Sequence, residues 1–237
     1  MKTITASFDN LDTANTARQA LNQAGFDSVS VRSQRADESA GDTIRADEHG
    51  NVADAGEVKA MVAAAVSQFG RLDYAFNNAG INNLGQDEYQ DEVWARSLAV
   101  NLSGVMHCMR EESEVMLAQG GGAIVNTASI NGIVGNGAQP GYCATKHGVV
   151  GLTRHGALRW AKAGIRVNAV CPGVIETPMT APLTANPEMK QVLDAMTPMG
   201  RMGRAEEVAS AVVWLCSDAA SFVTGHPLVI DGGATAV

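Results

Sequence analysis

The chain has 237 residues, of which 46% are hydrophobic, and this is enough for one domain with a substantial core. Its formal net charge is -8 and no basic stripe is present, which argues against nucleic acid or an anionic membrane as a partner. The start of the chain, MKTITASFDN, lacks the long apolar run of a signal peptide, and no stretch is long enough to cross a bilayer. The cysteines form no metal-ligand pattern with the histidines, so we expect reduced thiols in a cytoplasmic chain and no metal site.

Short β-rich runs alternate with helical patterns along the chain. Strands are predicted at residues 3–8, 28–32, 74–77, 123–127, 166–170 and 227–230. Helices are predicted at residues 11–23, 56–69, 91–118, 141–163 and 205–216. The alternation predicts a single α/β domain, a doubly wound parallel sheet with helices on both faces. The polar, acidic stretch at residues 33–57 predicts a loop, with a weak strand at 42–46 as the alternative.

Two side chains suited to acid–base chemistry lie four residues apart in the helical stretch GYCATKHGVVGLTR. Tyr142 and Lys146 therefore share one helix face, one turn apart. A phenol has a pKa of about 10, and a nearby ammonium group stabilises the phenolate and lowers that pKa. Such a pair also arises by chance on many helices, so it needs further support.

Polar and small residues at the ends of neighbouring strands supply that support. Ser129 follows the strand AIVNTAS, and the carboxyl ends of parallel strands form the ligand-binding edge of such sheets. The NNAG turn at residues 77–80 permits close approach of a ligand, or is simply a turn. Asn101 is a polar residue in an apolar helix, and it is either functional or a core amide satisfied by backbone groups.

Six motifs in register give the chain, from residue 51 to 233, a resemblance to the classical short-chain dehydrogenase/reductase family. They are NNAG at 77–80, VNLSG at 100–104, Ser129, YCATK at 142–146, PGVIETPM at 172–179 and SFVTGHPLVIDGG at 221–233. The resemblance implies hydride transfer between NAD or NADP and an alcohol or carbonyl compound.

The resemblance also implies a role for each matching residue. Tyr142 would be the general acid–base residue, Ser129 would orient the substrate oxygen, and Lys146 would lower the pKa of Tyr142 and hold the nicotinamide ribose. Asn101 would position a water molecule that links Lys146 to solvent. The other residues implied to bind the cofactor are Asn51, Val52, Asn78, Ala79, Gly80, Pro172, Gly173, Ile175 and Thr177.

The chain departs from the family pattern where the glycine-rich TGxxxGxG loop should follow the first strand. Aligned from Ala24–Gly25, the three glycine positions hold Phe8, Asp12 and Ala14. Asp9 and Asp12 place carboxylates where a pyrophosphate should bind a helix N-terminus. At about 4 Å and an effective dielectric of about 20, like charges repel by about 4 kcal/mol, which could weaken binding roughly a thousandfold.

The N-terminal segment is also weakly similar to the opening β-α-β unit of heat-induced general-stress proteins of the 17M-like class. This likeness covers only about thirty residues. The sequence therefore leaves two origins open, a natural replacement of the first Rossmann unit or drift within the family. Arg32, after the second strand, slightly favours NADP over NAD because a cation tolerates the 2′-phosphate, although a solvated surface arginine is the simpler interpretation.

The segment at residues 178–200 resembles the family's substrate loop. Its Met and Leu side chains suit an apolar pocket, and they would equally suit an amphipathic helix. The C-terminal tail resembles the one used in tetramer contacts, so we expect a homo-oligomer, a dimer or a tetramer. Three functions stay open: an oxidoreductase acting on an apolar alcohol or carbonyl compound, a cofactor-free interaction protein, and a proton-transfer catalyst without nicotinamide.

Overall fold

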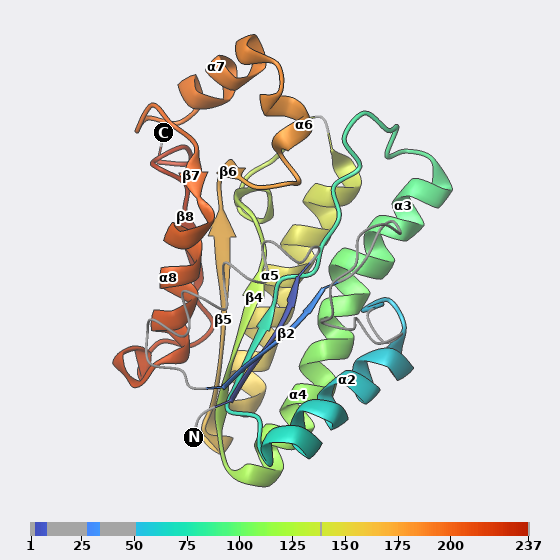
Figure 1. Cartoon of the computed structure of the whole chain (residues 1–237), viewed down its shortest axis with the longest axis vertical. Helices are drawn as coiled ribbons and strands as arrows, with labels where there is room; N and C mark the ends of the chain where they lie inside the picture. Colours follow the sequence, from blue (N-terminus) through green and yellow to red (C-terminus); the bar gives the residue numbers. More distant parts are fainter. Residues whose placement is uncertain (1–2, 9–27, 34–50, 138, 237) are drawn as a thin grey trace.

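The computed structural model describes residues 3–8, 28–33, 51–137 and 139–236. Six parallel strands form one twisted sheet in the order β2-β1-β3-β4-β5-β8 (Figure 1). The strands are β1 (Thr3–Phe8), β2 (Ser28–Ser33), β3 (Tyr74–Asn77), β4 (Gly122–Thr127), β5 (Ile165–Pro172) and β8 (Pro227–Ile230). The order runs outward from β1 in both directions, which is the topology of a doubly wound fold.

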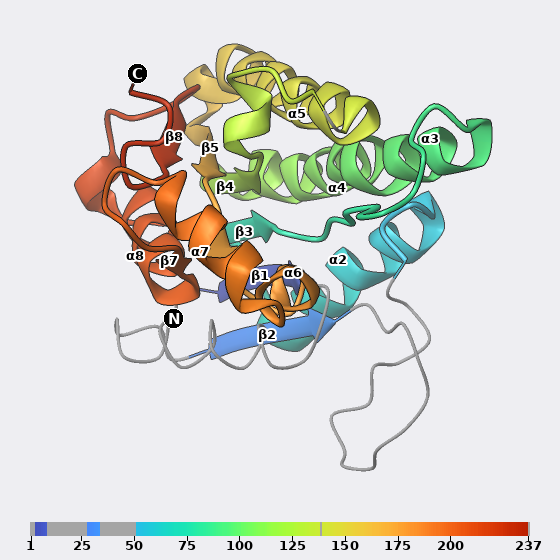
Figure 2. The ribbon, with the colours of Figure 1, turned by 90° about the horizontal axis from the view of Figure 1, so that it is seen from above.

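Helices cover both faces of the sheet (Figure 2). On one face lie α2 (Ala55–Phe69), α4 (Gly104–Gln119) and α5 (Pro140–Trp160), and their apolar side chains pack with Leu72 and Ile124 in the larger core. On the other face, α8 (Ala205–Cys216) packs Val212 and Leu215 on the side chains that β3, β4 and β5 turn to that face. Because alternate strand residues point to opposite faces, the same strands contribute side chains to both cores.

Local chemistry explains where the helices begin and end. The Asp54 carboxylate accepts hydrogen bonds from the backbone N–H groups of Gly56 and Glu57, at 2.7 and 3.1 Å, and so caps the start of α2. Gly120 ends α4 with a φ of 88°, a left-handed conformation that other residues adopt only with strain. The chain then turns directly into β4.

The carboxyl ends of the strands meet at one edge, and a second group of elements lies beyond it (Figure 1). This group comprises β6 (Ile175–Glu176), α6 (Ala181–Thr184), α7 (Pro187–Ala195) and β7 (Gly203–Arg204), and β6 pairs with β7 in parallel. It forms a cap over the edge where ligands bind in such sheets.

The predicted strands and the doubly wound fold are confirmed. The single helix predicted at 91–118 is three consecutive pieces: α3 (Asp91–Leu98), one π-helical turn (Ala99–Ser103) and α4. The loop predicted at 33–57 was too long at both ends, because Ser33 belongs to β2 and α2 begins at Ala55. The helix predicted at 11–23 and the weak strand at 42–46 lie outside the described residues. Within the described part of the chain, no helix is long and apolar enough to cross a membrane.

Candidate active site

A cavity of about 390 Å³ opens at the carboxyl edge of the sheet, between the strand ends and the cap. Its walls come from the loops after β3, β4 and β5, from the start of α5 and from the cap. Nine predicted site residues line it: Asn78, Gly80, Ser129, Tyr142, Lys146, Pro172, Gly173, Ile175 and Thr177. The fold therefore gathers into one space residues that are almost one hundred positions apart in the sequence.

Tyr142 and Ser129, the predicted acid–base residue and its partner, lie together in this cavity. Tyr142 lies in the first turn of α5, which begins at Pro140, a residue preorganised for that position. Burial raises the pKa of Tyr142, a hydrogen bond with the Ser129 side chain lowers it, and the negative charge of Glu88 raises it again. The net shift is upward. Burial therefore outweighs the hydrogen bond from Ser129. The lowering of this pKa by Lys146 stays a prediction.

Lys146 places a buried positive charge next to Tyr142. Its side chain is only 3% exposed, and Nζ donates a hydrogen bond to the Thr127 carbonyl oxygen at 2.9 Å. The same Nζ lies 5.4 Å from the centre of the Tyr142 ring, within range of a cation–π contact. The four-residue spacing read from the sequence thus brings the ammonium group and the phenol together on one helix face.

Asn101 lies in the π-helical turn, completely buried. Its Oδ1 accepts the Ile81 N–H at 2.7 Å, and its Nδ2 donates to the Ile81 carbonyl at 2.9 Å. The interpretation of Asn101 as a core amide satisfied by backbone groups is therefore confirmed for its side chain. These two bonds fix the loop that carries Gly80, and a π-helical turn is a frequent mark of a functional site. The water-positioning role stays a prediction.

Glu88 is a site residue that the sequence did not reveal. Its side chain is 3% exposed, and Oε2 accepts the Tyr142 backbone N–H at 3.1 Å. Gln139 precedes α5 without a side-chain capping bond, so Glu88 reaches across from another loop and caps the helix that carries Tyr142. In the sequence Glu88 stands in the acidic run QDEYQDE, which has the composition of a solvated surface.

Replacing Glu88 with Gln should shift the pH profile of catalysis. Glu88 raises the pKa of Tyr142 because two negative charges close together repel each other. The neutral variant Glu88→Gln should lower that pKa, so the pH midpoint of kcat/KM for alcohol oxidation should move to lower pH. Glu92→Gln is the matched control, since it removes the same charge from an exposed position on α3. A midpoint that stays in place or rises would contradict this role of Glu88.

Several features of the cavity fit a nicotinamide nucleotide. A side chain at Gly80 would place its Cβ 3.3 Å from Asn101 Oδ1 and 3.5 Å from Lys146 Nζ, so glycine keeps the approach to Lys146 open. At Gly173 a Cβ would lie 2.9 Å from the Asp231 Cβ, too close for any other residue without a shift. Asn78 is held by the Thr127 hydroxyl, which donates to Asn78 Oδ1 at 2.9 Å. The cavity therefore offers a narrow floor beside the buried ammonium group.

Four other predicted site residues do not line this cavity. Val52 packs in the core against Gly104, and Ala79 and Asn101 are buried. Asn51 is exposed, and its Oδ1 accepts the Ala53 N–H at 3.1 Å just before α2. The positions aligned with the last two loop glycines, Asp12 and Ala14, lie outside the described residues, as does Asp9. Phe8 and Arg32 are described only as backbone of β1 and β2.

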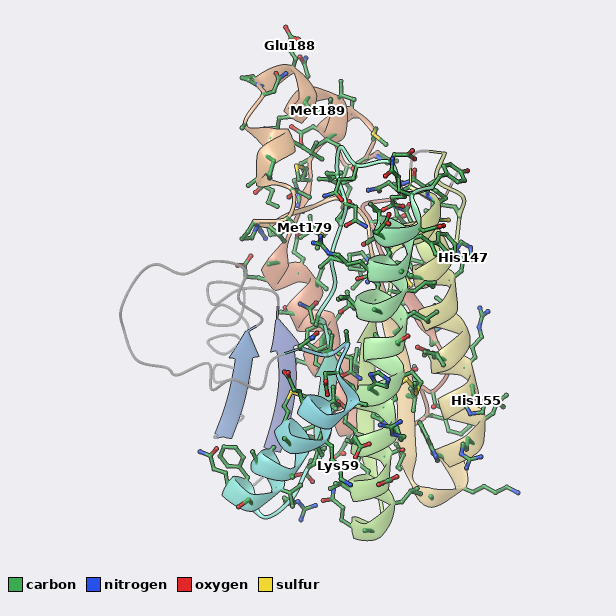
Figure 3. All side chains as sticks on the ribbon, turned by 90° about the vertical axis from the view of Figure 1, so that its right-hand side faces the viewer. Lys59, His147, His155, Met179, Glu188 and Met189 are labelled. Atoms are coloured by element: carbon green, nitrogen blue, oxygen red, sulfur yellow. The ribbon has the colours of Figure 1, made fainter. Side chains whose placement is uncertain are left out.

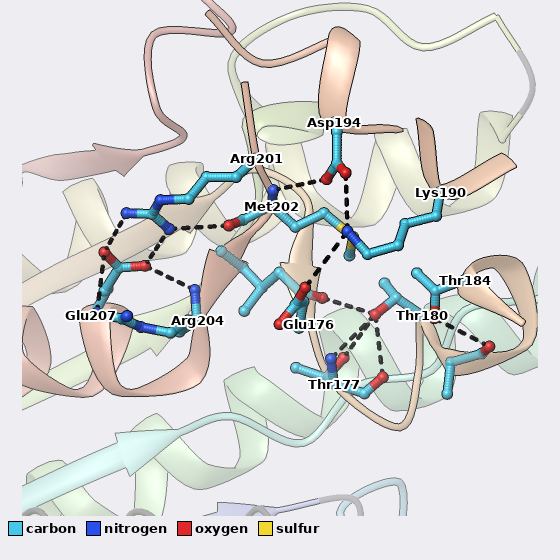
Figure 4. A network of polar contacts seen from close by, with 12 residues as sticks. Glu176, Thr177, Thr180, Thr184, Lys190, Asp194, Arg201, Met202, Arg204 and Glu207 are labelled. Atoms are coloured by element: carbon cyan, nitrogen blue, oxygen red, sulfur yellow. Dashed lines mark hydrogen bonds and ion pairs between the residues drawn. The ribbon is translucent and has the colours of Figure 1, made fainter. Parts of the chain in front are cut away.

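The cap is tied to the rest of the molecule by charged side chains (Figure 4). Asp194 on α7 pairs with Lys190 at 2.8 Å and accepts the Met202 N–H at 3.1 Å. Arg201 pairs with Glu207 on α8 at 2.7 Å. The Asp194 contacts brace the cap internally, and the Arg201–Glu207 pair links it to α8.

The inner side of the cap is apolar. Met179, Leu183, Leu193 and Met196 all line the cavity. Figure 3 places Met179 and Met189 on this cap, beyond the strand ends. Met189 does not line the cavity, whereas Met179, Leu183, Leu193 and Met196 do. The segment therefore fits both interpretations of its sequence, as a wall of an apolar pocket and as a helix with an apolar face. Thr180 closes the turn at the base of the cap by donating to the Ile175 carbonyl at 2.7 Å.

Comparison with known proteins agrees with this geometry. A family model described as "Enoyl-(Acyl carrier protein) reductase" matches residues 14–235. Cyclohexanol dehydrogenase from Acinetobacter sp. (strain SE19) is 49% identical over 189 residues, which cover 78% of this chain and 72% of that protein. Cis-4-hydroxycyclohexanecarboxylate dehydrogenase from Sinomonas cyclohexanicum is 44% identical over 189 residues, 79% of this chain and 75% of that protein. The solved structure of ElxO with NADP bound matches with a TM-score of 0.85 and 25% identity, covering 100% of this chain and 99% of that one.

The fold, the cavity and these relatives together define a nucleotide-dependent oxidoreductase. The chain belongs to the short-chain dehydrogenase/reductase family, whose members use NAD or NADP. The predicted oxidoreductase is thereby confirmed, and the cofactor-free alternative is not favoured.

Proposed function

We propose that this protein is an NADP-dependent dehydrogenase that interconverts an apolar cyclic secondary alcohol and its ketone. The observation that carries the proposal is the joint placement of Tyr142, Ser129 and Lys146 at the floor of a largely apolar cavity. The names of two relatives, both dehydrogenases of ring alcohols, support the substrate class.

Each residue of the floor has a separate task in this reaction. When bound, the nicotinamide supplies or accepts the hydride at the substrate carbon. Tyr142 gives a proton to the carbonyl oxygen in the reducing direction and takes it from the hydroxyl in the oxidising direction. Ser129 donates a hydrogen bond to the same oxygen and so fixes its distance from Tyr142. Lys146 offsets the negative charge on the phenolate, and Asn101 supports this arrangement by fixing the loop of Gly80.

We further propose that the nucleotide lies along Asn78, Gly80, Pro172 and Gly173, with the nicotinamide amide near Ile175 and Thr177. Asn51, Val52 and Ala79 would lie toward the adenosine end, outside the cavity described above. The preference for NADP over NAD is supported by the NADP-bound neighbour and by Arg32 near the end of β2. The unreacting part of the substrate would then contact the apolar wall of the cap.

We also propose a cytoplasmic homo-oligomer. Several large apolar side chains of the described residues face solvent in the single chain, among them Leu158 at 87% exposure and Phe222 at 102%. Exposed apolar groups of this kind are typical of surfaces that a partner covers. All four cysteines are free, and three of them are buried, as expected for a reducing compartment.

The first experiment is a titration with NADPH and NADH, followed by nucleotide fluorescence and by the melting temperature. We expect saturable binding at micromolar concentrations, tighter for NADPH, and then reduction of NADP+ when cyclohexanol is added. No binding at millimolar nucleotide would refute the proposed reaction. It would indicate that Asp9 and Asp12 repel the pyrophosphate as the sequence suggests.

A further inference from the structure

The wall of the cavity that faces the substrate contains a chain of side-chain amides close to Tyr142. Gln139 donates a hydrogen bond from Nε2 to Asn82 Oδ1, and Asn136 Nδ2 donates to Gln139 Oε1 at 3.5 Å. All three residues line the cavity, and Gln139 comes just three positions before Tyr142, at the start of α5. These residues, Asn82, Asn136 and Gln139, are called the amide cluster below.

Two members of the amide cluster, Asn82 and Gln139, keep hydrogen-bonding capacity that their contacts among the described residues do not use. A primary amide has two N–H donors and an oxygen with two acceptor positions. Gln139 Nε2 donates one of its two hydrogens to Asn82 Oδ1. Among the described residues, the side-chain nitrogen of Asn82 donates to no acceptor. Both residues are partly buried at the cavity surface. If Asn82 and Gln139 served only to clamp the loop after β3 to α5, their remaining N–H groups would not need to face the cavity.

The charge of the cavity indicates which ligand groups those donors can bind. Among the described residues that line the cavity, Lys146 carries the one charge, and its ammonium group is bonded to the Thr127 carbonyl and stacked on Tyr142. The amide cluster thus offers neutral donors and acceptors with no cation beside them. A carboxylate brought there would lose water without gaining a counter-charge, whereas a hydroxyl or a carbonyl group would exchange one hydrogen bond for another.

Most of the remaining wall of the cavity is apolar, although Asn131 and Thr177 also line it. Leu84 lies on the same loop as Asn82, and Met179, Leu183 and Met196 approach from the cap. A pocket of this kind holds a hydrophobic body by shape and orients it with a few polar groups. The amide cluster and the Tyr142–Ser129 pair are two such polar points in one apolar space.

We propose that the amide cluster is a second recognition point, which selects substrates with an uncharged oxygen, a hydroxyl or a carbonyl, away from the reacting carbon. The preferred substrate is therefore a diol or hydroxyketone on an apolar ring. This inference rests on the proposed function for its reaction, but it makes a separate statement about binding.

The test compares three ring alcohols that differ at one position: cyclohexanol, cyclohexane-1,4-diol and cis-4-hydroxycyclohexanecarboxylate. Dissociation constants are measured by ligand-observed NMR with and without NADP+, and kcat/KM is measured where turnover occurs. One additional net hydrogen bond at a partly exposed site should favour the diol over cyclohexanol about five- to tenfold. The carboxylate should bind at least about tenfold more weakly than the diol.

Two variants separate recognition from damage to the fold. Gln139→Leu removes the contact but leaves Asn82 Oδ1 without its donor, so this variant should also melt at a lower temperature. The double variant Asn82→Leu with Gln139→Leu removes both partners, so it should bind the diol and cyclohexanol within about twofold of each other. Leu183→Met, which keeps the volume of the apolar wall, is the control and should change all three ligands alike. Melting curves verify that each variant is folded.

The outcomes are distinct. Equal binding of the diol and cyclohexanol by the wild-type chain, or a diol preference that survives in the double variant, would overturn the inference. Tightest binding of the carboxylate would overturn it as well, as would failure of all three alcohols to bind. If NADPH does not bind while the diol preference and its loss in the variants are observed, only the proposed reaction fails. If nucleotide binds and all alcohols react equally well, only the amide cluster's role fails.

Discussion

Tyr142→Phe should lower kcat by about 10²- to 10⁴-fold, the usual contribution of a positioned general acid or base. The substitution removes a single oxygen and leaves the ring on α5 below the cap, where Lys146 Nζ lies 5.4 Å from its centre. The cavity and the stacking contact should therefore persist, and the dissociation constant for NADPH should change by no more than about threefold. The loss should appear in kcat, because proton transfer to the substrate oxygen occurs only in the transition state.

Tyr89→Phe is the matched control for this substitution. Tyr89 comes directly after Glu88 in the sequence, and its side chain is 83% exposed. The Tyr89→Phe variant therefore loses a phenol hydroxyl near the site but outside the cavity. Its kcat should equal that of the wild-type enzyme within about twofold. Tyr142→Phe with more than a tenth of wild-type kcat would disprove acid–base catalysis by this residue. In that case Ser129 or solvent would have to supply the proton.

The second large effect concerns stability and arises from a carboxyl group in the core. Glu112 on α4 is 1% exposed, and its Oε2 accepts a hydrogen bond from Asn77 Nδ2 at 3.0 Å. Burial raises the pKa of Glu112 from 4.5 to about 7, and the bond from Asn77 only partly opposes this. Asn77 also donates to Asn126, and Asn126 donates to Thr153, so the carboxyl group belongs to a buried polar network that links β3, β4, α4 and α5.

The sign of the pH effect follows from this raised pKa. Between pH 4.5 and about pH 7 the folded chain retains a proton on Glu112 that the unfolded chain releases, so the free energy of unfolding falls as pH rises through this window. Because one pKa unit is worth about 1.36 kcal/mol, the group should remove about 2–3 kcal/mol of stability between pH 5 and pH 8. Glu112→Gln cannot titrate, and its profile should be flatter than the wild-type profile by that amount.

Urea unfolding at pH 5 and pH 8, at one protein concentration, measures this difference. Comparing the change between the two pH values removes any constant effect of the new amide on packing. Glu114→Gln on the exposed side of the same helix is the control, and it should keep the wild-type pH dependence. A Glu112→Gln profile parallel to the wild-type profile would mean that Glu112 titrates normally in the folded chain.

The strands and the placement of Tyr142 beside Lys146 could be predicted because their signals are local. Strand–helix alternation predicted the sheet, and Tyr142 with Lys146 needed only the helix period to be placed on one face. Ser129 was recognised because it ends a strand at the carboxyl edge. The direction of the pKa shift of Tyr142 could not be predicted, since it depends on the extent of burial and on Glu88, a residue 54 positions earlier in the chain.

The amide cluster and Glu112 were not predicted for a related reason. An Asn or Gln in a loop predicts nothing by itself. Asn82 and Gln139 meet only because the loop after β3 and the start of α5 both lie at the carboxyl edge of the sheet. A Glu in a polar helix such as GVMHCMREESEVMLAQ usually faces solvent. Which face of α4 is buried, and that Asn77 lies opposite Glu112, follow from how the helix packs on the sheet.

By itself, the sequence determined the order of strands and helices and which polar side chains share a helix face, because hydrophobic periodicity and short spacings act within a few residues along the chain. Tertiary structure alone decided how buried each ionisable group is, which distant amides meet in the cavity and how the cap is tied over it. Hydrogen bonding and desolvation act over a few ångströms in space, and sequence separation does not specify those distances.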